Sequence, residues 1–417
     1  MHRQSVLISG VGIAGPALAF WLLRHGFAPT LVERAPRPRS EGYLIDFWGL
    51  GYEIVEKMGL LPDILAAGYR VREVRLVDTR GQRVGGFDLD VFREATNGQY
   101  TTLPRGELSA ILSRAIEGRA ETLFGNSVTA LEEETDGVVV HFAHGCARRF
   151  DLVVGADGLH SAIRSLAFGP ESQFERFLGY AVAAFDLFGY RPRDENVYIG
   201  CSVPGQQLAR FAMRDDRTMI LAVIADDAAS AIDPHDTNAH KAYLRGRLSG
   251  SGWECPQILA AMEKCGDIYF DRVSQICMDR WSRGRIALVG DAAFAPSLLA
   301  GQGSALAVIG AYVLAGELAC ADRHEDAFAR YETLLHAFMV HKQEAARGFA
   351  GAFAPKTRCG IFLRNQITKA FAVPYVAKLA IGSNLLDRLE LPDYSVLRRS
   401  VLRRSNLGTA AQGCVHR

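Results

Sequence analysis

A glycine-rich turn close to the N-terminus constrains the fold of this chain more than any other feature. Residues 5–33 read "SVLISGVGIAGPALAFWLLRHGFAPTLVE", which predicts a buried strand, a turn, a helix and a second strand. In such a unit Gly10 permits the tight turn, Gly12 lets the backbone approach a pyrophosphate, and Gly15 lets the helix pack on the strand. Glu33 ends the second strand and is placed to accept hydrogen bonds from ribose hydroxyls. The segment therefore predicts a dinucleotide site, in preference to a glycine-rich turn that binds nothing.

Two later segments share this design. "DLVVGADG" (151–158) and "RIALVGDAA" (285–293) each read as an apolar strand followed by a sharp turn. Together with the first segment they predict three neighbouring strands whose carboxyl ends meet one ligand. Asp291 is placed to hold a ribityl hydroxyl, and Gly301 and Gly303 let backbone lie close to a flat ring. The regular alternation of a simple NAD dehydrogenase stops after the second strand, which favours FAD as the bound dinucleotide.

A different pattern occupies the middle of the chain. Residues 176–275 alternate apolar and polar side chains, as in "YAVAAFDLFGY", which predicts antiparallel strands. We expect this sheet to cover the flavin and its inward side chains to line a mostly apolar pocket for a flat, hydrophobic substrate. By spacing, Phe185, Phe211 and Met213 are candidates for that pocket, and ordinary core packing is the alternative for each.

The predicted fold class is α/β, with a Rossmann-like FAD-binding domain, an interleaved substrate domain built on an antiparallel β-sheet, and C-terminal helices. Parts of 70–105 are further candidates for the substrate domain. We expect the C-terminal helices to pack over that domain. The predicted boundaries are 1–175 and 276–330 for the FAD-binding domain, 176–275 for the substrate domain, 331–394 for the helical region and 395–417 for a tail expected to be disordered.

Over residues 1 to about 335 these motifs resemble the FAD-dependent aromatic hydroxylases of the p-hydroxybenzoate hydroxylase type, the group A flavoprotein monooxygenases. The resemblance implies that Asp157-Gly158, followed by Arg164, serves both FAD and a nicotinamide nucleotide. It also implies that Arg105 lies beside the flavin and pyrophosphate and that Arg34 is on the adenosine side, where a surface charge is the alternative. The expected cofactor-binding residues are Gly10, Gly12, Ala14, Gly15, Glu33, Arg34, Arg105, Asp157, Asp291, Gly301, Gln302 and Gly303.

Within that family, "WSRGRIALVGDAA" and "GAYVLAGELACAD" are most similar to the tetracycline destructases and related polyketide-modifying monooxygenases. Three positions depart from the usual pattern: Phe294 stands where the family has His, Leu298 replaces a proline next to the flavin, and Ala305 replaces Asn. Leu298 is therefore a further candidate for substrate contact. The changes at Leu298 and Ala305 leave the glycine cradle itself in place.

The resemblance implies a reaction of NAD(P)H and O2 that hydroxylates an aromatic or polyketide-like, even tetracycline-like, molecule through a flavin C4a-hydroperoxide. No catalytic side chain is expected, because the cofactor carries the chemistry. Two alternatives stay open: a flavin oxidoreductase that inserts no oxygen, and an FAD-containing protein that only binds an aromatic ligand. The choice between NADH and NADPH is also open.

Composition narrows the partners. The 47 basic and 46 acidic side chains give a net charge of +1, which argues against nucleic acid. The eight cysteines form no CxxC and no zinc-spaced group, so we expect no metal and a reducing, cytoplasmic location. No transmembrane helix is expected, since no run of 18 apolar residues occurs. Packing over the substrate domain is favoured for the basic C-terminal helix, and contact with a membrane surface is the alternative. We expect a monomer or a homodimer.

Overall fold

The computed structural model describes residues 4–38, 43–226, 232, 236–371 and 389–394. It has a mixed α/β fold with parallel and antiparallel sheets, as the sequence predicts. The tail predicted over 395–417 lies outside the described residues, as does 372–388 of the C-terminal region.

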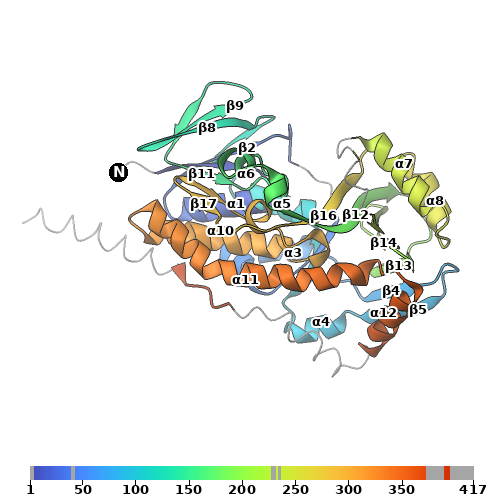
Figure 1. Cartoon of the computed structure of the whole chain (residues 1–417). Helices are drawn as coiled ribbons and strands as arrows, with labels where there is room; N and C mark the ends of the chain where they lie inside the picture. Colours follow the sequence, from blue (N-terminus) through green and yellow to red (C-terminus); the bar gives the residue numbers. More distant parts are fainter. Residues whose placement is uncertain (1–3, 39–42, 227–231, 233–235, 372–388, 395–417) are drawn as a thin grey trace, which may run out of the picture.

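A six-stranded sheet lies at one end of the molecule (Figure 1). β1 is central, with β11 on one side and β2 on the other, and all neighbours are parallel except the short edge strand β17. The carboxyl ends of three parallel strands, each followed by a glycine-bearing turn, therefore meet at one edge. In spatial order the strands are β17 (Ser282–Arg283), β18 (Ile286–Leu288), β11 (Leu152–Gly155), β1 (Ser5–Ser9), β2 (Ala28–Glu33) and β7 (Glu121–Phe124).

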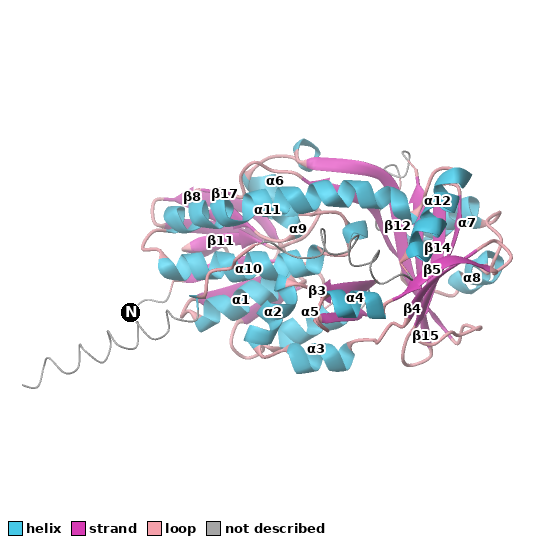
Figure 2. Ribbon diagram, turned by 90° about the horizontal axis from the view of Figure 1, so that it is seen from below, coloured by secondary structure: helices cyan, strands magenta, loops and turns pink. Residues whose placement is uncertain are grey.

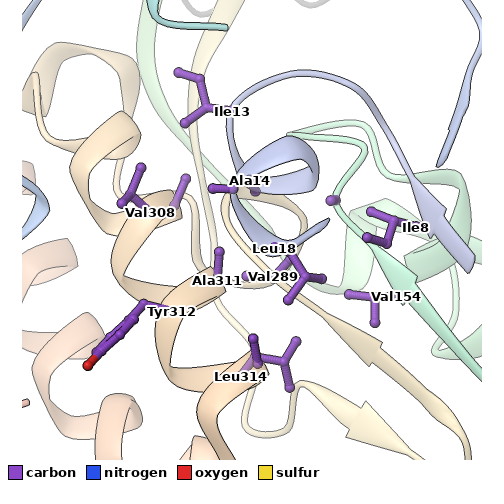
Figure 3. Close-up of a cluster of buried hydrophobic side chains, with 14 of the residues drawn as sticks. Ile8, Ile13, Ala14, Leu18, Val154, Val289, Val308, Ala311, Tyr312 and Leu314 are labelled. Carbon is purple, nitrogen blue, oxygen red and sulfur yellow. The ribbon is translucent and has the colours of Figure 1, made fainter. Parts of the chain in front are cut away.

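Two helices that begin at this edge form the core behind it. α1 (Ala14–Arg24) and α10 (Gly303–Cys320) pack against each other, with Leu18 and Val308 among the buried side chains between helices and strands (Figure 3). α10 is apolar and long enough to cross a membrane, but 78% of its residues are buried inside the protein. It is therefore the central helix of a largely apolar core.

The second large sheet has seven strands and is antiparallel except where β13 runs parallel to β4. α7 (Thr237–Leu248) and α8 (Cys255–Met262) cover one face, which we call the outer face. β4 and β5 come from the 70–105 stretch that the sequence offered as a candidate for this sheet. In spatial order the strands are β16 (Tyr269–Ile276), β12 (Glu175–Phe188), β15 (Arg217–Ala225), β14 (Gln206–Ala212), β13 (Val197–Val203), β4 (Glu73–Val77) and β5 (Arg83–Asp88).

A two-stranded ribbon joins the two sheets. β3 (Leu44–Trp48) pairs with β6 (Tyr100–Pro104), and its side chains alternate between two cores. Ile45 and Phe47 enter the core of the six-stranded sheet, whereas Leu44 and Trp48 pack with residues of the other, inner face of the seven-stranded sheet. The ribbon therefore forms the wall that both halves share.

The remaining elements complete these layers. β8 (Val128–Glu134), β9 (Gly137–Phe142) and β10 (Arg148–Phe150) form a small antiparallel sheet. The short helices are α2 (Leu50–Met58), α3 (Leu61–Ala67), α4 (Asp90–Ala95), α5 (Arg105–Arg114), α6 (Ala162–Ala167) and α9 (Asp291–Phe294), with 3-10 turns η1 (Glu171–Gln173) and η3 (Leu298–Ala300).

Two C-terminal helices run back over the molecule (Figure 2). α11 (His324–Phe353) begins seven residues before the predicted helical region and contacts α9, η3 and β12, so it reaches both sheets. α12 (Arg358–Ala370) packs on β5, where Thr368 Oγ1 accepts a hydrogen bond from the amide of Gly86. This agrees with the expectation that a C-terminal helix covers the second sheet.

The closest approach between α2 and α10 yields a stability prediction. A Cβ added at Gly51 would lie 2.7 Å from the Cβ of Ala305, so Gly51→Ala should lower the free energy of unfolding by about 1–3 kcal/mol. The matched control is Gly246→Ala in α7, where no atom lies within 4 Å and the change should be neutral or stabilising by up to about 1 kcal/mol. Urea unfolding of both variants measures the difference, and equal stabilities would contradict the proposed helix contact.

Candidate functional site

The turn between β1 and α1 is built by backbone atoms in close contact. Gly10 has φ +107°, and a Cβ there would overlap the carbonyl of Ala156 at the end of β11. A Cβ at Gly15 would overlap the carbonyl oxygen of Gly10. Neither position can take a side chain without displacing backbone, which agrees with the spatial role the sequence predicts for both glycines.

Gly12 differs from these two because its surroundings are open. A Cβ there would have one neighbour within 4 Å, the Nη2 atom of Arg105, at 3.9 Å. Arg105 is the first residue of α5, and its amide donates to the carbonyl of Tyr43. A guanidinium thus faces a side-chain-free loop at the start of α1, a helix with no side-chain cap. Such a pairing suits an anion, because the loop amides and the arginine offer donors from two sides.

Glu33 has a structural partner that the sequence did not predict. Its Oε2 accepts from the amide of Val11 at 2.9 Å and its Oε1 from the amide of Ala35 at 2.9 Å, so it fixes the glycine loop relative to β2. Each carboxylate oxygen keeps a second acceptor site. Arg34 is exposed beyond the end of β2, as its surface-charge alternative describes.

Asp157 also organises its own turn. It accepts hydrogen bonds from Ser161 Oγ at 2.5 Å and from the amides of Ala162 and Ile163 at the start of α6. Burial raises the pKa of the Asp157 carboxyl above its usual value, although these hydrogen bonds lower it. Arg164 is fully buried and donates to the carbonyl of Ala292 at 3.0 Å. It therefore ties the turn after β11 to the turn after β18.

The third turn packs directly on the first. Gly290 has φ +68°, and a Cβ there would lie 2.9 Å from the Cβ of Ala14. Asp291 begins α9, and its Oδ1 would lie 3.4 Å from a Cβ on Gly303. Gln302 is the N-cap residue of α10 and offers it no side-chain hydrogen bond. The structure thus brings the three predicted glycine turns together at one edge.

Two tyrosines and an aspartate of this region were missed by the sequence analysis. Tyr43 packs against Tyr269 of β16, with ring centroids 5.6 Å apart, and Asp271 lies two residues further on the same strand. Burial raises the pKa of Tyr43 to about 12 and also raises the pKa of Asp291. Burial alone lowers the pKa of Arg105, but the neighbouring Tyr43, Tyr269 and Asp291 leave it above its usual value. No local motif marks these residues, because Tyr43 precedes the ribbon whereas Tyr269 and Asp271 come from the second sheet.

His160 connects the turn after β11 to the second sheet. Its Nδ1 lies 2.9 Å from Glu171 Oε1 and its Nε2 lies 3.2 Å from Asp271 Oδ1. These two hydrogen bonds raise the pKa of His160 to about 10, so the ring is an imidazolium at neutral pH. The bridge fixes β16 against the cradle at its solvent-accessible side.

The segment leading into α10 is held by two amide side chains. Gln275 Nε2 donates to the carbonyl of Pro296 at 2.8 Å, and Gln343 Nε2 donates to the carbonyls of Ile276 and Ala295. Ser297 is held at φ +112°, which is strained for a residue other than glycine. Gly301 then turns the chain, with no atom within 4 Å of a would-be Cβ.

The departures from the family pattern have packing explanations. Phe294 is buried away from the cradle against Trp281, with ring centroids 4.7 Å apart. Ala305 meets Gly51, so a longer side chain at 305 would collide with α2. Leu298 packs among apolar residues of the inner face of the seven-stranded sheet, including Val182 and Val223.

The three candidate pocket residues of the second sheet do not lie together. Phe211 and Met213 belong to one cluster on the inner face, which also contains Leu44 and Trp48 of the ribbon. Phe185 pairs with Ile220 and packs on the outer face under α7 and α8, so its assignment to the pocket was wrong. Alternate residues of a strand point to opposite faces, and Phe185 is one register step away from the inner row.

The chain is similar in sequence and in structure to known flavin-dependent proteins. A family model described as FAD binding domain matches residues 3–339. A flavin-dependent monooxygenase from an unknown prokaryotic organism is 35% identical, over 94% of this chain and 100% of its own. Two crystal structures of tetracycline destructases superpose closely: Tet(51) at 28% identity and TM-score 0.80, and Tet(55) at 31% and 0.78. Each covers 94% of this chain and at least 99% of its own.

The His160 bridge predicts a stability that depends on pH. Its pKa is about 10 in the folded chain against a usual 6.5, so its contribution is fully present below pH 6.5 and is lost as the pH rises through about 10. The difference in unfolding free energy between the native chain and His160→Gln should shrink over that range, as measured by denaturant titration at several pH values. The exposed His144→Gln serves as control, and a difference that stays constant up to pH 10 would refute the bridge.

Proposed function

The chain belongs to the FAD-binding-domain family of flavin-dependent monooxygenases, and from this we propose that it hydroxylates an aromatic or polyketide-like molecule with NAD(P)H and O2. The observation that carries the proposal is the meeting of three glycine turns beneath Arg105 at one edge of a parallel sheet. In this proposal the six-stranded sheet carries the cofactor and the inner face of the seven-stranded sheet covers the substrate.

The residues of the edge suit FAD. The open space over Gly12, closed by Arg105, has the donors and the room for a pyrophosphate. Glu33 keeps free acceptor sites for ribose, and Asp291 is placed for the ribityl hydroxyls. Gly301 and the uncapped start of α10 leave backbone amides for a flat ring. FAD, when bound, supplies the redox and oxygen chemistry.

The protein's own part is to position the reactants and to exclude water. The ribbon β3–β6 and the apolar inner-face residues Phe211, Met213 and Leu298 provide a surface with few polar groups next to the cradle. Such surroundings hold an apolar substrate and keep water from the reacting atoms. His160 links the turn after β11 to β16 of the second sheet, and Arg164 joins the turns after β11 and β18 within the first sheet.

We assign NAD(P)H as a transient co-substrate. Among the described residues there is one parallel sheet of this dinucleotide-binding type, and only its β1–α1 turn has the Gly-x-Gly-x-x-Gly arrangement. The nicotinamide nucleotide would therefore dock on the surface near Asp157-Gly158 rather than in a domain of its own. We further propose a cytoplasmic monomer or homodimer, in keeping with the reduced cysteines expected from the sequence.

The similarity to tetracycline destructases suggests the first substrate class to test. Tet(51) and Tet(55) act, by their names, on tetracycline, and each matches nearly the whole of this chain. A flat fused-ring molecule of this type fits the apolar inner face. We propose tetracyclines and related polyketides as the first candidates.

Activity is tested directly with purified, FAD-loaded protein. NADPH or NADH oxidation should rise at least about tenfold in the presence of one member of a panel of phenols, polyketides and tetracyclines. The product should carry one additional oxygen atom derived from isotopically labelled O2, as measured by mass spectrometry. Oxidation of the nicotinamide without oxygen insertion or released peroxide would instead favour an oxidoreductase, and ligand binding without turnover would favour a binding protein.

Substitution at Gly12 tests the cofactor assignment. An isopropyl group there would fill the space beneath Arg105, so Gly12→Val should weaken FAD binding by at least about 100-fold, or more than about 2.7 kcal/mol. The fold should persist, because no other protein atom lies within 4 Å of the added Cβ. Flavin absorbance after gel filtration measures retention, with circular dichroism as the check on folding. Full flavin occupancy in a folded variant would overturn the pyrophosphate site.

A further inference from the structure

A single carboxylate lies on the wall between the two sheets. Asp46 is on β3 between Leu44 and Trp48, on the face of the ribbon that looks toward the inner face of the seven-stranded sheet. Its neighbours there are the apolar residues that contain Phe211 and Met213. A carboxylate in such surroundings is costly unless its oxygens are hydrogen-bonded or paired with a cation.

The hydrogen bonds of Asp46 satisfy only one of its two oxygens. Tyr100 Oη donates to Oδ1 at 2.5 Å and Thr102 Oγ1 donates to the same Oδ1 at 2.6 Å. Within the described ranges no donor reaches Oδ2 and no cation is paired with the carboxylate. Burial raises the pKa of Asp46, while the bonds from Thr102 and Tyr100 lower it. Oδ2 therefore keeps its full capacity to accept hydrogen bonds.

A second polar group beside the same apolar cluster also lacks a hydrogen-bond partner among the described residues. Tyr198 of β13 packs against this cluster, and its hydroxyl is buried without a hydrogen-bond partner in the described part of the chain. Buried hydroxyls are rarely left unpaired unless a ligand or water completes them. Asp46 and Tyr198 come from opposite walls, the ribbon and the inner face. The region where these walls meet therefore contains two polar groups with unused hydrogen-bonding capacity.

The position of Asp46 along the ribbon places it next to the proposed cofactor site. Tyr43 precedes β3 and Arg105 follows β6, and both belong to the cradle. Asp46 is three residues from Tyr43, which at about 3.3 Å per residue is about 10 Å along the strand. Asp46 is therefore close to the cradle along the ribbon and lies on the face of the ribbon that meets the inner-face residues.

We propose that Asp46 is a specificity-determining residue of the substrate site: its free Oδ2 accepts a hydrogen bond from a neutral hydroxyl group on a flat apolar substrate, and its negative charge rejects substrates that carry a carboxylate. The inference rests on the proposed function, because it assigns the space between ribbon and inner face to the substrate. A site built to bond a hydroxyl discriminates strongly against an analogue that lacks it. A like charge in an apolar site is disfavoured further.

Three probes that share one ring system and differ in a single substituent test the role of Asp46. The FAD-loaded enzyme is titrated with 2-naphthol, with its methyl ether and with 2-naphthoate, and the dissociation constants are read from changes in flavin absorbance. The same three derivatives of anthracene extend the series to a larger ring system. The native enzyme should bind the hydroxyl compound at least about tenfold more tightly than the ether, and the carboxylate most weakly.

Asp46→Asn changes the charge and not the volume. The preference for hydroxyl over ether should fall to within about threefold, because an amide nitrogen facing the ligand donates equally to either oxygen. Naphthoate should bind about tenfold more tightly than it binds the native enzyme, since the repulsion is gone. Asp63→Asn, on the exposed face of α3, makes the same charge change elsewhere and should leave all three constants as they are. A damaged fold would weaken the binding of all three probes. It would not lower the preference for the hydroxyl compound and at the same time strengthen the binding of naphthoate.

Several outcomes would overturn the inference. They are a native enzyme that treats the three probes alike or binds no member of either series, and an Asp46→Asn enzyme that keeps the hydroxyl preference. If FAD is retained and nicotinamide oxidation is stimulated by aromatic compounds, such results remove only the role of Asp46. A protein that takes up no FAD removes the proposed function, and this inference with it.

Discussion

The architecture depends on the close backbone contact at the turn between β1 and α1. The carbonyl of Gly10 lies where a side chain on Gly15 would be, and the position of a side chain on Gly10 is taken by the backbone of Ala156. These contacts bring α1 onto the sheet and align the ends of β1 and β11. Gly290 then packs on Ala14, which adds the third turn and the start of α9. Because backbone cannot yield as a long side chain can, the edge is rigid, and rigidity is what a site that positions reactants requires.

The ribbon β3–β6 connects this rigid edge to the second sheet. One face of the ribbon completes the core behind the glycine turns, and the other meets the inner face of the seven-stranded sheet. Polar contacts support the same junction: the exposed His160 bridges to β16, and the buried Gln275 and Gln343 hold the segment before α10. The ribbon therefore places the rigid cradle and the apolar inner face on two sides of one shared wall.

Residues that belong to a local motif could be predicted from the sequence, whereas residues brought together by strand pairing could not. Gly12 was predicted from a local motif and Arg105 from its match to the family arginine, and the Arg105 guanidinium does face that glycine. Phe185 was placed on the wrong face, because a period of two gives alternation but not its phase against the partner strand. Tyr43, Tyr269 and Asp271 were missed, since no spacing along the chain connects β3 to β16.

The sequence by itself determined the mixed α/β fold and the three turns, because each rests on short-range requirements of the backbone: glycine where a Cβ cannot fit, and apolar runs where a strand is buried. The family, and with it the place of Arg105, followed from the resemblance of these motifs to known proteins. The tertiary structure decided which side chains face one another across the two sheets. Glu33 is engaged by the amides of Val11 and Ala35, Phe294 turns into the core, and Asp46 keeps one oxygen free on an apolar wall. These outcomes depend on strand register and on contacts between residues far apart in the chain, and local propensity carries no information about either.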